Sequence, residues 1–342
     1  MITIYTEGHA RHDPPHEFLE GRLISYNETP SRAETILRAV REAGLGPVVE
    51  PREWGLEPIL AVHTPAYLEH LRTIYERWCA AGGPAEGALP AIIPVRGLER
   101  RSPAPFAEVG YFAFDLSAPV GPHTYEVALG SAHCALTGAA LLLEGERLAY
   151  TLCRPPGHHA HPALMGGFCY LNNAAIAADH LARATGRPVA LLDIDVHAGN
   201  GTQAIFYERA DVLFLSIHGA PEWEYPYFAG FADETGAGAG AGYTVNYPLE
   251  PGVDDRRYLG VLDEALARIA AFGPGYLVLS AGFDTFAGDP LGKFSLSSAC
   301  YPAIGTRIAA LELPTLVVQE GGYTVAALGQ NAVGLLRGLE GR

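Results

Sequence analysis

Six short apolar runs divide this chain, and segments with helical periodicity lie between most of them. The runs are Ile2–Thr6, Leu148–Leu152, Val189–Ile194, Val212–Ile217, Tyr276–Ser280 and Thr315–Gln319. The predicted helices are Ala66–Ala81, Tyr125–Glu144, Asn173–Thr185, Arg256–Ala271 and Val325–Gly338, with a further helix that Ser31 caps in a capping box with Glu34. Strands apolar throughout that alternate with helices predict an open, mostly parallel sheet with helices on both faces. We therefore expect an α/β fold and a single domain over residues 1–342.

Two regions depart from this alternation. Residues 82–122 are rich in glycine and proline and show little periodicity, which predicts a loop insertion. Residues 233–243 read DETGAGAGAGY and have the glycines of a phosphate-binding loop, but they lack its GK[ST] ending. We interpret these glycines as a source of flexibility.

The composition limits the partners that the chain can bind. It has 38 acidic and 23 basic residues, a formal net charge of −15, which disfavours nucleic acid and anionic membranes and tolerates a small cationic ligand. The sequence shows no export signal and no apolar run near the roughly 18 residues of a membrane span. Five cysteines without CxxC spacing predict reduced thiols in a cytoplasmic protein: Cys79, Cys134, Cys153, Cys169 and Cys300.

Polar side chains of catalytic type follow four of the predicted strands. Because ligands bind beyond the carboxyl ends of parallel strands, we expect these side chains to meet at one edge of the sheet. They are His158 and His159 after Leu148–Leu152, Asp195 and His197 after Val189–Ile194, Asp284 after Tyr276–Ser280, and Tyr323 after Thr315–Gln319.

Three of these side chains could hold a metal ion. Asp195, His197 and Asp284 offer two carboxylates and one imidazole, which suit Zn²⁺ or Fe²⁺ and leave a position open for water. Such an ion lowers the pKa of its water and polarises a substrate carbonyl. The site is therefore predicted to be hydrolytic.

The two histidines and the tyrosine add the remaining groups that hydrolysis needs. His158 and His159 are acid–base candidates beside that water. Tyr323 lies next to two glycines and could donate to a developing oxyanion. The buried carboxylate of Asp193 requires a partner, which is either a catalytic histidine or a bound monovalent cation completed by Ser216.

Six motifs together resemble a known family. RPPGHHA, GGFCYLNNAA, LLDIDVHAGNGTQ, FLSIHG, SAGFDTF and QEGGY occur in this order. They resemble the zinc-dependent histone deacetylases, which have the arginase–deacetylase fold. The opening region, HTPAYLEHL and the insertion after Gly82 are most similar to the bacterial acetylpolyamine amidohydrolases of this family. The resemblance implies a deacetylase that releases acetate from an N-acetylated amine, most of all an acetylpolyamine; the alternatives are acetyl-lysine in proteins or peptides and another small acetylated amine.

The resemblance also implies a role for each matching residue. Asp195, His197 and Asp284 correspond to the ligands of one zinc ion. His159 corresponds to the general base and acid, with Asn200 behind it, and His158 to its electrostatic partner, with Asp193 behind it. Tyr323 corresponds to the residue that binds the scissile carbonyl. A structural potassium site is implied at Asp193, Asp195, His197, Ser216 and Ile217, and a second at Phe206 and Val212.

The resemblance also implies a substrate channel and a homodimer, but fewer residues match the family pattern there than at the metal site. Phe168 and Tyr225 correspond to the channel walls, and the Gly167 carbonyl to the acceptor of the substrate amide N–H. Candidate acids near the channel mouth for a distal ammonium are Glu17, Glu108 and Asp115, and Ser117 stands where a further acid is expected. Ala198 replaces a histidine of the family pattern, but opposite orientation of strand neighbours leaves His197 able to reach the metal. The insertion at residues 82–122 implies a homodimer.

Overall fold

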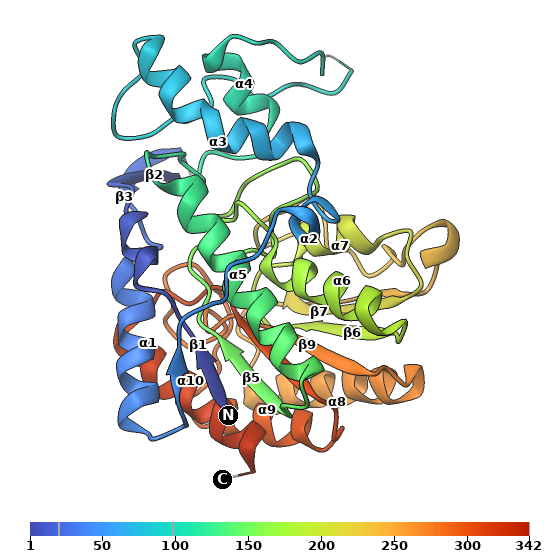
Figure 1. Ribbon diagram of the computed structural model, residues 1–342. Coiled ribbons are helices and arrows are strands. Elements are labelled where there is room, and N and C mark those ends of the chain that lie inside the picture. The colour runs from blue at the N-terminus through green and yellow to red at the C-terminus, as the bar shows by residue number, and fades with distance from the viewer. Residues whose placement is uncertain (20, 98, 342) are drawn as a thin grey trace.

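Eight parallel strands form one sheet in the computed structural model, which describes residues 1–19, 21–97 and 99–341 (Figure 1). Residue 98 of the predicted insertion and residues 20 and 342 lie outside this description. The strand order is β4-β1-β5-β10-β9-β6-β7-β8. Their bounds are β1 Ile2–Ile4, β4 Val48–Val49, β5 Leu148–Thr151, β6 Val189–Asp193, β7 Val212–Gly219, β8 Thr244–Leu249, β9 Tyr276–Ala281 and β10 Thr315–Gln319.

All six predicted strands are present. They could be recognised because the central strands are buried on both faces and therefore have continuous apolar sequences. Two edge strands escaped prediction. β8 reads TVNYPL and is only half buried, so its sequence lacks a long apolar run. β4 has only two residues.

Helices cover both faces of the sheet (Figure 1). On one face α5 (Thr124–Leu143) and α6 (Asn173–Thr185) pack with α3 (Pro65–Ala80) into one core. On the other face a second core contains α1 (Pro30–Glu42), α8 (Asp255–Phe272), α9 (Cys300–Ala309) and α10 (Val325–Glu340). The shorter elements are the hairpin β2 His16–Leu19 and β3 Arg22–Ser25, the helices α2 Glu57–Leu60, α4 Pro105–Tyr111 and α7 Asn200–Phe206, and the 3₁₀ turns Glu7–Arg11 and Gly238–Gly240. The prediction of an α/β fold with a mostly parallel sheet is confirmed.

Two local predictions were wrong, and a third left out a second role of the residues concerned. The capping box at Ser31 and Glu34 is absent from the described helix start: α1 begins at Pro30, since proline suits the first helical turn, and Ser31 instead bonds the Thr29 hydroxyl at 2.7 Å. The glycines of residues 233–243 also serve close packing, because a Cβ at Gly240 would lie 2.5 Å from the Tyr207 carbonyl oxygen. Finally, α5 is long and apolar enough to cross a membrane, although 72% of that segment is buried inside the protein, as in a core helix.

Residues of the predicted insertion lie beyond the carboxyl ends of the strands, beside α3 (Figure 1). Its two ends are joined by backbone hydrogen bonds between Ala88 and Val120, at 2.8 and 3.0 Å. This closure places α4 and the intervening loop above the edge of the sheet where the strand-end side chains gather.

Candidate metal-dependent active site

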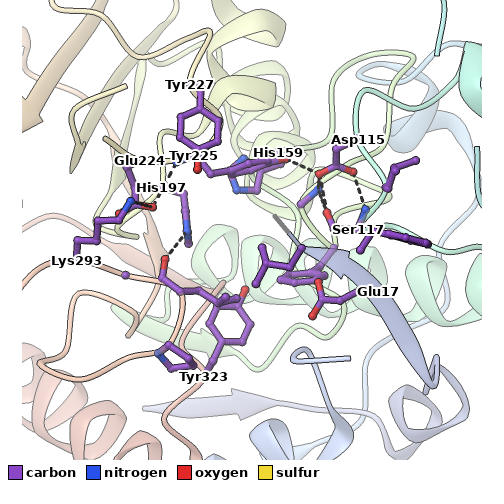
Figure 2. A pocket seen from close by; sticks show the side chains of 18 residues that line it. Glu17, Asp115, Ser117, His159, His197, Glu224, Tyr225, Tyr227, Lys293 and Tyr323 are labelled. Atoms are coloured by element: carbon purple, nitrogen blue, oxygen red, sulfur yellow. Dashed lines mark hydrogen bonds and ion pairs between the residues drawn. The ribbon is translucent and has the colours of Figure 1, made fainter. Parts of the chain in front are cut away.

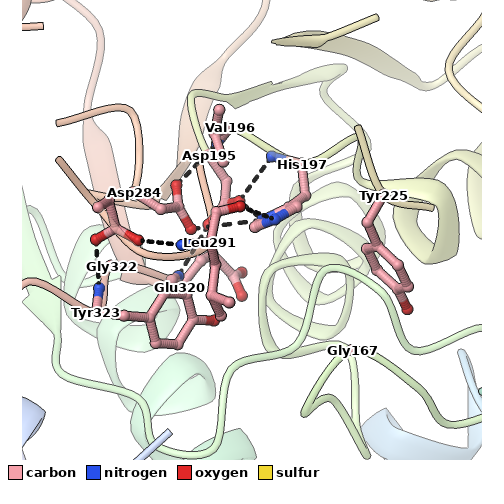
Figure 3. A network of polar contacts seen from close by, with 12 residues as sticks. Gly167, Asp195, Val196, His197, Tyr225, Asp284, Leu291, Glu320, Gly322 and Tyr323 are labelled. Atoms are coloured by element: carbon pink, nitrogen blue, oxygen red, sulfur yellow. Dashed lines mark hydrogen bonds and ion pairs between the residues drawn. The ribbon is translucent and has the colours of Figure 1, made fainter. Parts of the chain in front are cut away.

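Four neighbouring strands bring the predicted catalytic side chains together. β5, β10, β9 and β6 are adjacent in the sheet and parallel, so their carboxyl ends share one edge. The segments that follow them carry the histidine pair, Tyr323, Asp284, and Asp195 with His197. Figure 3 shows Tyr323, Asp284, Asp195 and His197. Residues more than 100 positions apart in the chain therefore form one site.

Asp195, His197 and Asp284 form a buried group whose donor atoms all lie within 4.8 Å of one another. The His197 Nε2–H donates to the Leu291 carbonyl at 3.1 Å, which leaves the Nδ1 lone pair facing the carboxylates. That Nδ1 lies 3.0 Å from Asp195 Oδ1 and 3.5 Å from Asp284 Oδ2. Three electron-rich atoms this close repel one another unless a proton or a metal ion lies between them.

Further evidence for a cation comes from Asp284. Its Oδ2 is buried and receives no hydrogen bond from any group in the described ranges. Burial, together with the charge of Asp195, raises the pKa of Asp284 to about 7. A divalent ion would stabilise both charges, and the donor set fits one.

The reason that we gave for the reach of His197 was wrong. β6 ends at Asp193, so residues 195–198 lie beyond the strand, and strand alternation does not orient them. His197 is held instead by its contacts with Leu291 and Asp195.

The two histidines have different partners. The His158 Nδ1–H donates to Asp193 Oδ2 at 3.0 Å, and the His159 Nδ1–H donates to Asn200 Oδ1 at 2.6 Å. Burial opposes the charge on His158, but the carboxylates of Asp195 and Asp193 outweigh it and raise its pKa to about 10. Burial and the charge on His158 lower the pKa of His159 well below its usual value. The pair therefore combines one charged and one neutral ring.

Two residues that hold this pair, His161 and Glu320, were not predicted from the sequence. Asn200 donates through Nδ2 to His161 Nε2 at 2.9 Å, so His161 fixes the orientation of the Asn200 amide. Glu320 is buried and accepts hydrogen bonds from the backbone N–H groups of Gly157 and His158, at 2.7 and 3.2 Å. Their only sequence signals are their positions within the motifs GHHAH and QEGGY.

A third missed residue holds the loop of Tyr323. Asp289 accepts from the backbone N–H of Tyr323 at 2.7 Å and from that of Leu291 at 3.1 Å. The Tyr323 ring lies 5.6 Å from the ring of Phe168 and carries the Arg32 guanidinium 4.8 Å from its centroid. Asp289 thereby connects the loop of Tyr323 with the residue whose carbonyl orients His197.

A cavity of about 320 Å³ opens onto the site (Figure 2). Its lining includes His159, His197 and Tyr323 at the base and the predicted walls Phe168 and Tyr225. The predicted Gly167, Glu17 and Asp115 also line it, with Ser117, Glu224, Tyr227 and Lys293.

The two predicted acids in the cavity, Glu17 and Asp115, differ in whether they can accept a further hydrogen bond. Glu17 accepts through Oε1 from the backbone and the side chain of Asn27, both at 2.8 Å, whereas Oε2 is buried and unbonded within the described chain. Burial raises the pKa of Glu17 to about 7. Asp115 is already occupied, because Oδ2 accepts from the Gly167 N–H and the Tyr225 hydroxyl, each at 2.8 Å.

The third predicted acid, Glu108, does not belong to the channel. It is fully buried and ion-paired with Arg77 and, at 2.6 Å, with Arg101. Burial opposes its charge, but these two arginines hold the pKa of Glu108 below its usual value. Its role is to join α4 to α3, and the prediction that it receives a substrate ammonium was wrong.

The residues predicted to bind potassium at the first site include Asp193, the last residue of β6, and Ser216 and Ile217 within β7. Ser216 pairs with Asp193 in the register of these strands, and its hydroxyl lies 2.7 Å from His218 Nδ1. Ile217 follows it, and Phe206 and Val212 lie buried in α7 and at the start of β7. Potassium at these positions stays a prediction.

Comparisons with known proteins agree along the whole chain. The profile described as the histone deacetylase domain matches residues 26–339. Acetylpolyamine amidohydrolase 1 of Pseudomonas aeruginosa is 47% identical over 344 residues, which cover 100% of this chain and 99% of that protein. The acetylpolyamine amidohydrolase of Mycoplana ramosa is 45% identical, with 100% of both chains covered. The crystal structure of acetylpolyamine aminohydrolase from Burkholderia pseudomallei superposes with a TM-score of 0.95 at 42% identity and covers 99% of this chain and 98% of that one.

Proposed function

This chain belongs to the histone deacetylase family, and we propose that it hydrolyses N-acetylated amines, above all acetylpolyamines, to the free amine and acetate. Its similarity to acetylpolyamine amidohydrolases and to the histone deacetylase domain supports an amide-hydrolysing deacetylase. The observation that carries the proposal is the group of Asp195, His197 and Asp284 beside a neutral His159, at the base of a cavity with an acid in its wall.

We assign the divalent ion to Asp195, His197 and Asp284, and zinc is the ion that these ligands suit best, with Fe²⁺ as the alternative. When bound, such an ion lowers the pKa of water and polarises a carbonyl. We also assign structural potassium to the place where Asp193, the last residue of β6, lies beside Ser216 of β7.

The proton transfers belong to His159. Because its Nδ1–H is bound by Asn200, Nε2 is the nitrogen that accepts a proton from the attacking water. The same Nε2–H then donates that proton to the leaving nitrogen as the amide C–N bond breaks. His158 stays charged beside Asp193 and favours the negative charge that develops on the carbonyl oxygen.

Tyr323 and Gly167 orient the acetamide. The Tyr323 hydroxyl donates to the carbonyl oxygen, and the Gly167 carbonyl accepts the amide N–H. Phe168 and Tyr225 enclose the methylene chain that follows, and the free oxygen of Glu17 accepts the distal ammonium. A short cationic chain uses all of these groups.

We further propose that the enzyme is a cytoplasmic homodimer. The insertion carries exposed apolar side chains, with Ile92 65%, Val95 59% and Phe106 39% exposed, which is typical of a surface that another copy covers. The five cysteines of the described chain are unpaired, as suits a reducing compartment. Light scattering coupled to gel filtration tests the dimer, and a monomer mass would contradict it.

The decisive experiment combines turnover with metal analysis. Purified enzyme is assayed on acetylputrescine, acetylspermidine and an acetyl-lysine peptide, with bound metal measured in the same sample. We expect one divalent ion per chain at the catalytic site and the highest kcat/KM on an acetylated polyamine. A higher kcat/KM on the peptide would reject the polyamine assignment, and Asp284→Asn provides the metal-free control.

A further inference from the structure

Lys293 is the only lysine among the 342 residues of this protein, and it lies at the mouth of the active-site cavity. Its Nζ lies 3.6 Å from Glu224 Oε1 and also donates to the Trp223 carbonyl. The side chain of Lys293 is 48% exposed, so its ammonium is within reach of a ligand that enters from solvent. Its positive charge lies at the entrance of a cavity that is proposed to bind positively charged amines, so it should affect which amines bind.

The partner of this lysine is a buried carboxylate. The side chain of Glu224 is only 6% exposed and contributes to the cavity lining. Its Oε1 accepts the Tyr225 N–H at 3.3 Å, whereas Oε2 is buried and makes no hydrogen bond to the described residues. Glu224 therefore retains an acceptor, and Lys293 is the side-chain cation that the structure pairs with it.

The mouth is thus divided into two sides. Figure 2 shows Glu224 and Lys293 together on one side and Glu17 with Asp115 on the other. On the Glu17 side a carboxyl oxygen is free, because Asp115 is occupied by its own hydrogen bonds. On the Glu224 side the lysine cancels the charge of the carboxylate.

We infer that Lys293 is a specificity-determining residue, which limits the mouth to one ammonium subsite at Glu17 by neutralising a second one at Glu224. The inference rests on the proposed function. It makes acetylated diamines, with one distal ammonium, better substrates than acetylated triamines, with two. The physical reason is that a second ammonium near Glu224 meets an equal positive charge and gains no net attraction.

The test compares Lys293→Met with Lys293→Arg on three substrates. Acetylputrescine carries one distal ammonium, N8-acetylspermidine carries two, and N-butylacetamide is acetylputrescine without its amine. Lys293→Met exposes Glu224 and should raise the kcat/KM ratio of acetylspermidine to acetylputrescine about fivefold, as for one partly exposed ion pair. Lys293→Arg keeps the charge and should keep the wild-type ratio.

Two further measurements identify the cause. In a Glu224→Gln background, Lys293→Met should no longer raise the ratio, because no carboxylate is left to expose. The gain of the single variant should also shrink as the salt concentration rises. The inference is overturned if Lys293→Met leaves the ratio unchanged, or if it raises the ratio equally in the Glu224→Gln background. It is also overturned if Lys293→Met raises kcat/KM for N-butylacetamide as much as it raises kcat/KM for acetylspermidine. A wild-type enzyme that hydrolyses neither cationic substrate overturns the proposed function, and the inference with it.

Discussion

The Nδ1 atom of His159 lies 2.6 Å from Oδ1 of Asn200, and this one contact decides which nitrogen of the histidine acts as the base. The amide can accept at Oδ1 only while its Nδ2 points the other way, where His161 Nε2 accepts at 2.9 Å. A residue outside the cavity lining therefore controls the tautomer of the base.

We expect His161→Phe to lower kcat about tenfold with little change in KM, the scale of losses at residues that orient a catalytic group. Without an acceptor at this place, the Asn200 amide can rotate and present its NH₂ group to His159. Steady-state kinetics across pH measure the effect, and His161→Gln, which retains an acceptor, should recover part of it. Equal kcat in the wild type and His161→Phe would contradict the role.

Tyr323→Phe should reduce kcat by about 10²–10³, since it removes one donor to the developing oxyanion. The ring keeps its contacts with Phe168 and Arg32, so the thermal midpoint should stay close to that of the wild type. Turnover of acetylputrescine and a melting curve are measured on the same preparation. Undiminished kcat would remove Tyr323 from the mechanism.

Removing the metal should abolish turnover and lower the thermal midpoint, because the bound ion stabilises two buried carboxylates that otherwise repel each other. A chelator titration followed by calorimetry measures this, and added Zn²⁺ or Fe²⁺ should restore both properties. Asp284→Asn should show low activity and no response to the chelator. A chelator that leaves the wild-type midpoint and activity unchanged would contradict the site.

The pKa of about 7 at Glu17 predicts a pH-dependent affinity for cations. Below that pH the carboxyl group is protonated, so KM for acetylputrescine should rise as pH falls from 8 to 6, while KM for N-butylacetamide should not. Glu17→Gln should remove the difference between the two substrates. A KM profile for acetylputrescine that matches that of the neutral amide would exclude Glu17 as the ammonium acceptor.

The contribution of Glu17 to folding stability should fall as pH rises, whereas its affinity for a cation should increase. Folding raises the pKa of Glu17, so the folded state loses stability as pH rises from the unfolded value near 4.5 through about 7. Glu17→Gln should therefore stabilise the protein more at pH 8 than at pH 5. Thermal midpoints of both proteins at the two pH values check the sign.

The sequence predicts the catalytic edge well because parallel strands force their carboxyl ends together. Once the apolar runs are placed, His158, Asp195, Asp284 and Tyr323 must meet. Residues that act through backbone N–H groups, such as Glu320, leave no such pattern. Their partners are fixed only when the chain folds.

Glu108 illustrates the opposite error. Its charge suggested a substrate contact, but Arg77, 31 positions earlier, and Arg101 neutralise it inside the protein. The pairing of charges across such separations depends on how α3 and α4 pack, which the local sequence does not encode. Glu17 has no such partner within the described residues and keeps an acceptor free.

The position of β10 in the sheet has a consequence for biosynthesis. β10 comes last in the chain, yet it lies between β5 and β9, and Tyr323 follows it directly. A nascent polypeptide that has emerged as far as Asp284 already holds both histidines and all three candidate ligands, but it still lacks the strand that lies between β5 and β9. Hydrolysis therefore cannot start before β10 and Tyr323 have been synthesised, and we expect a product that ends upstream of residue 315 to be inactive.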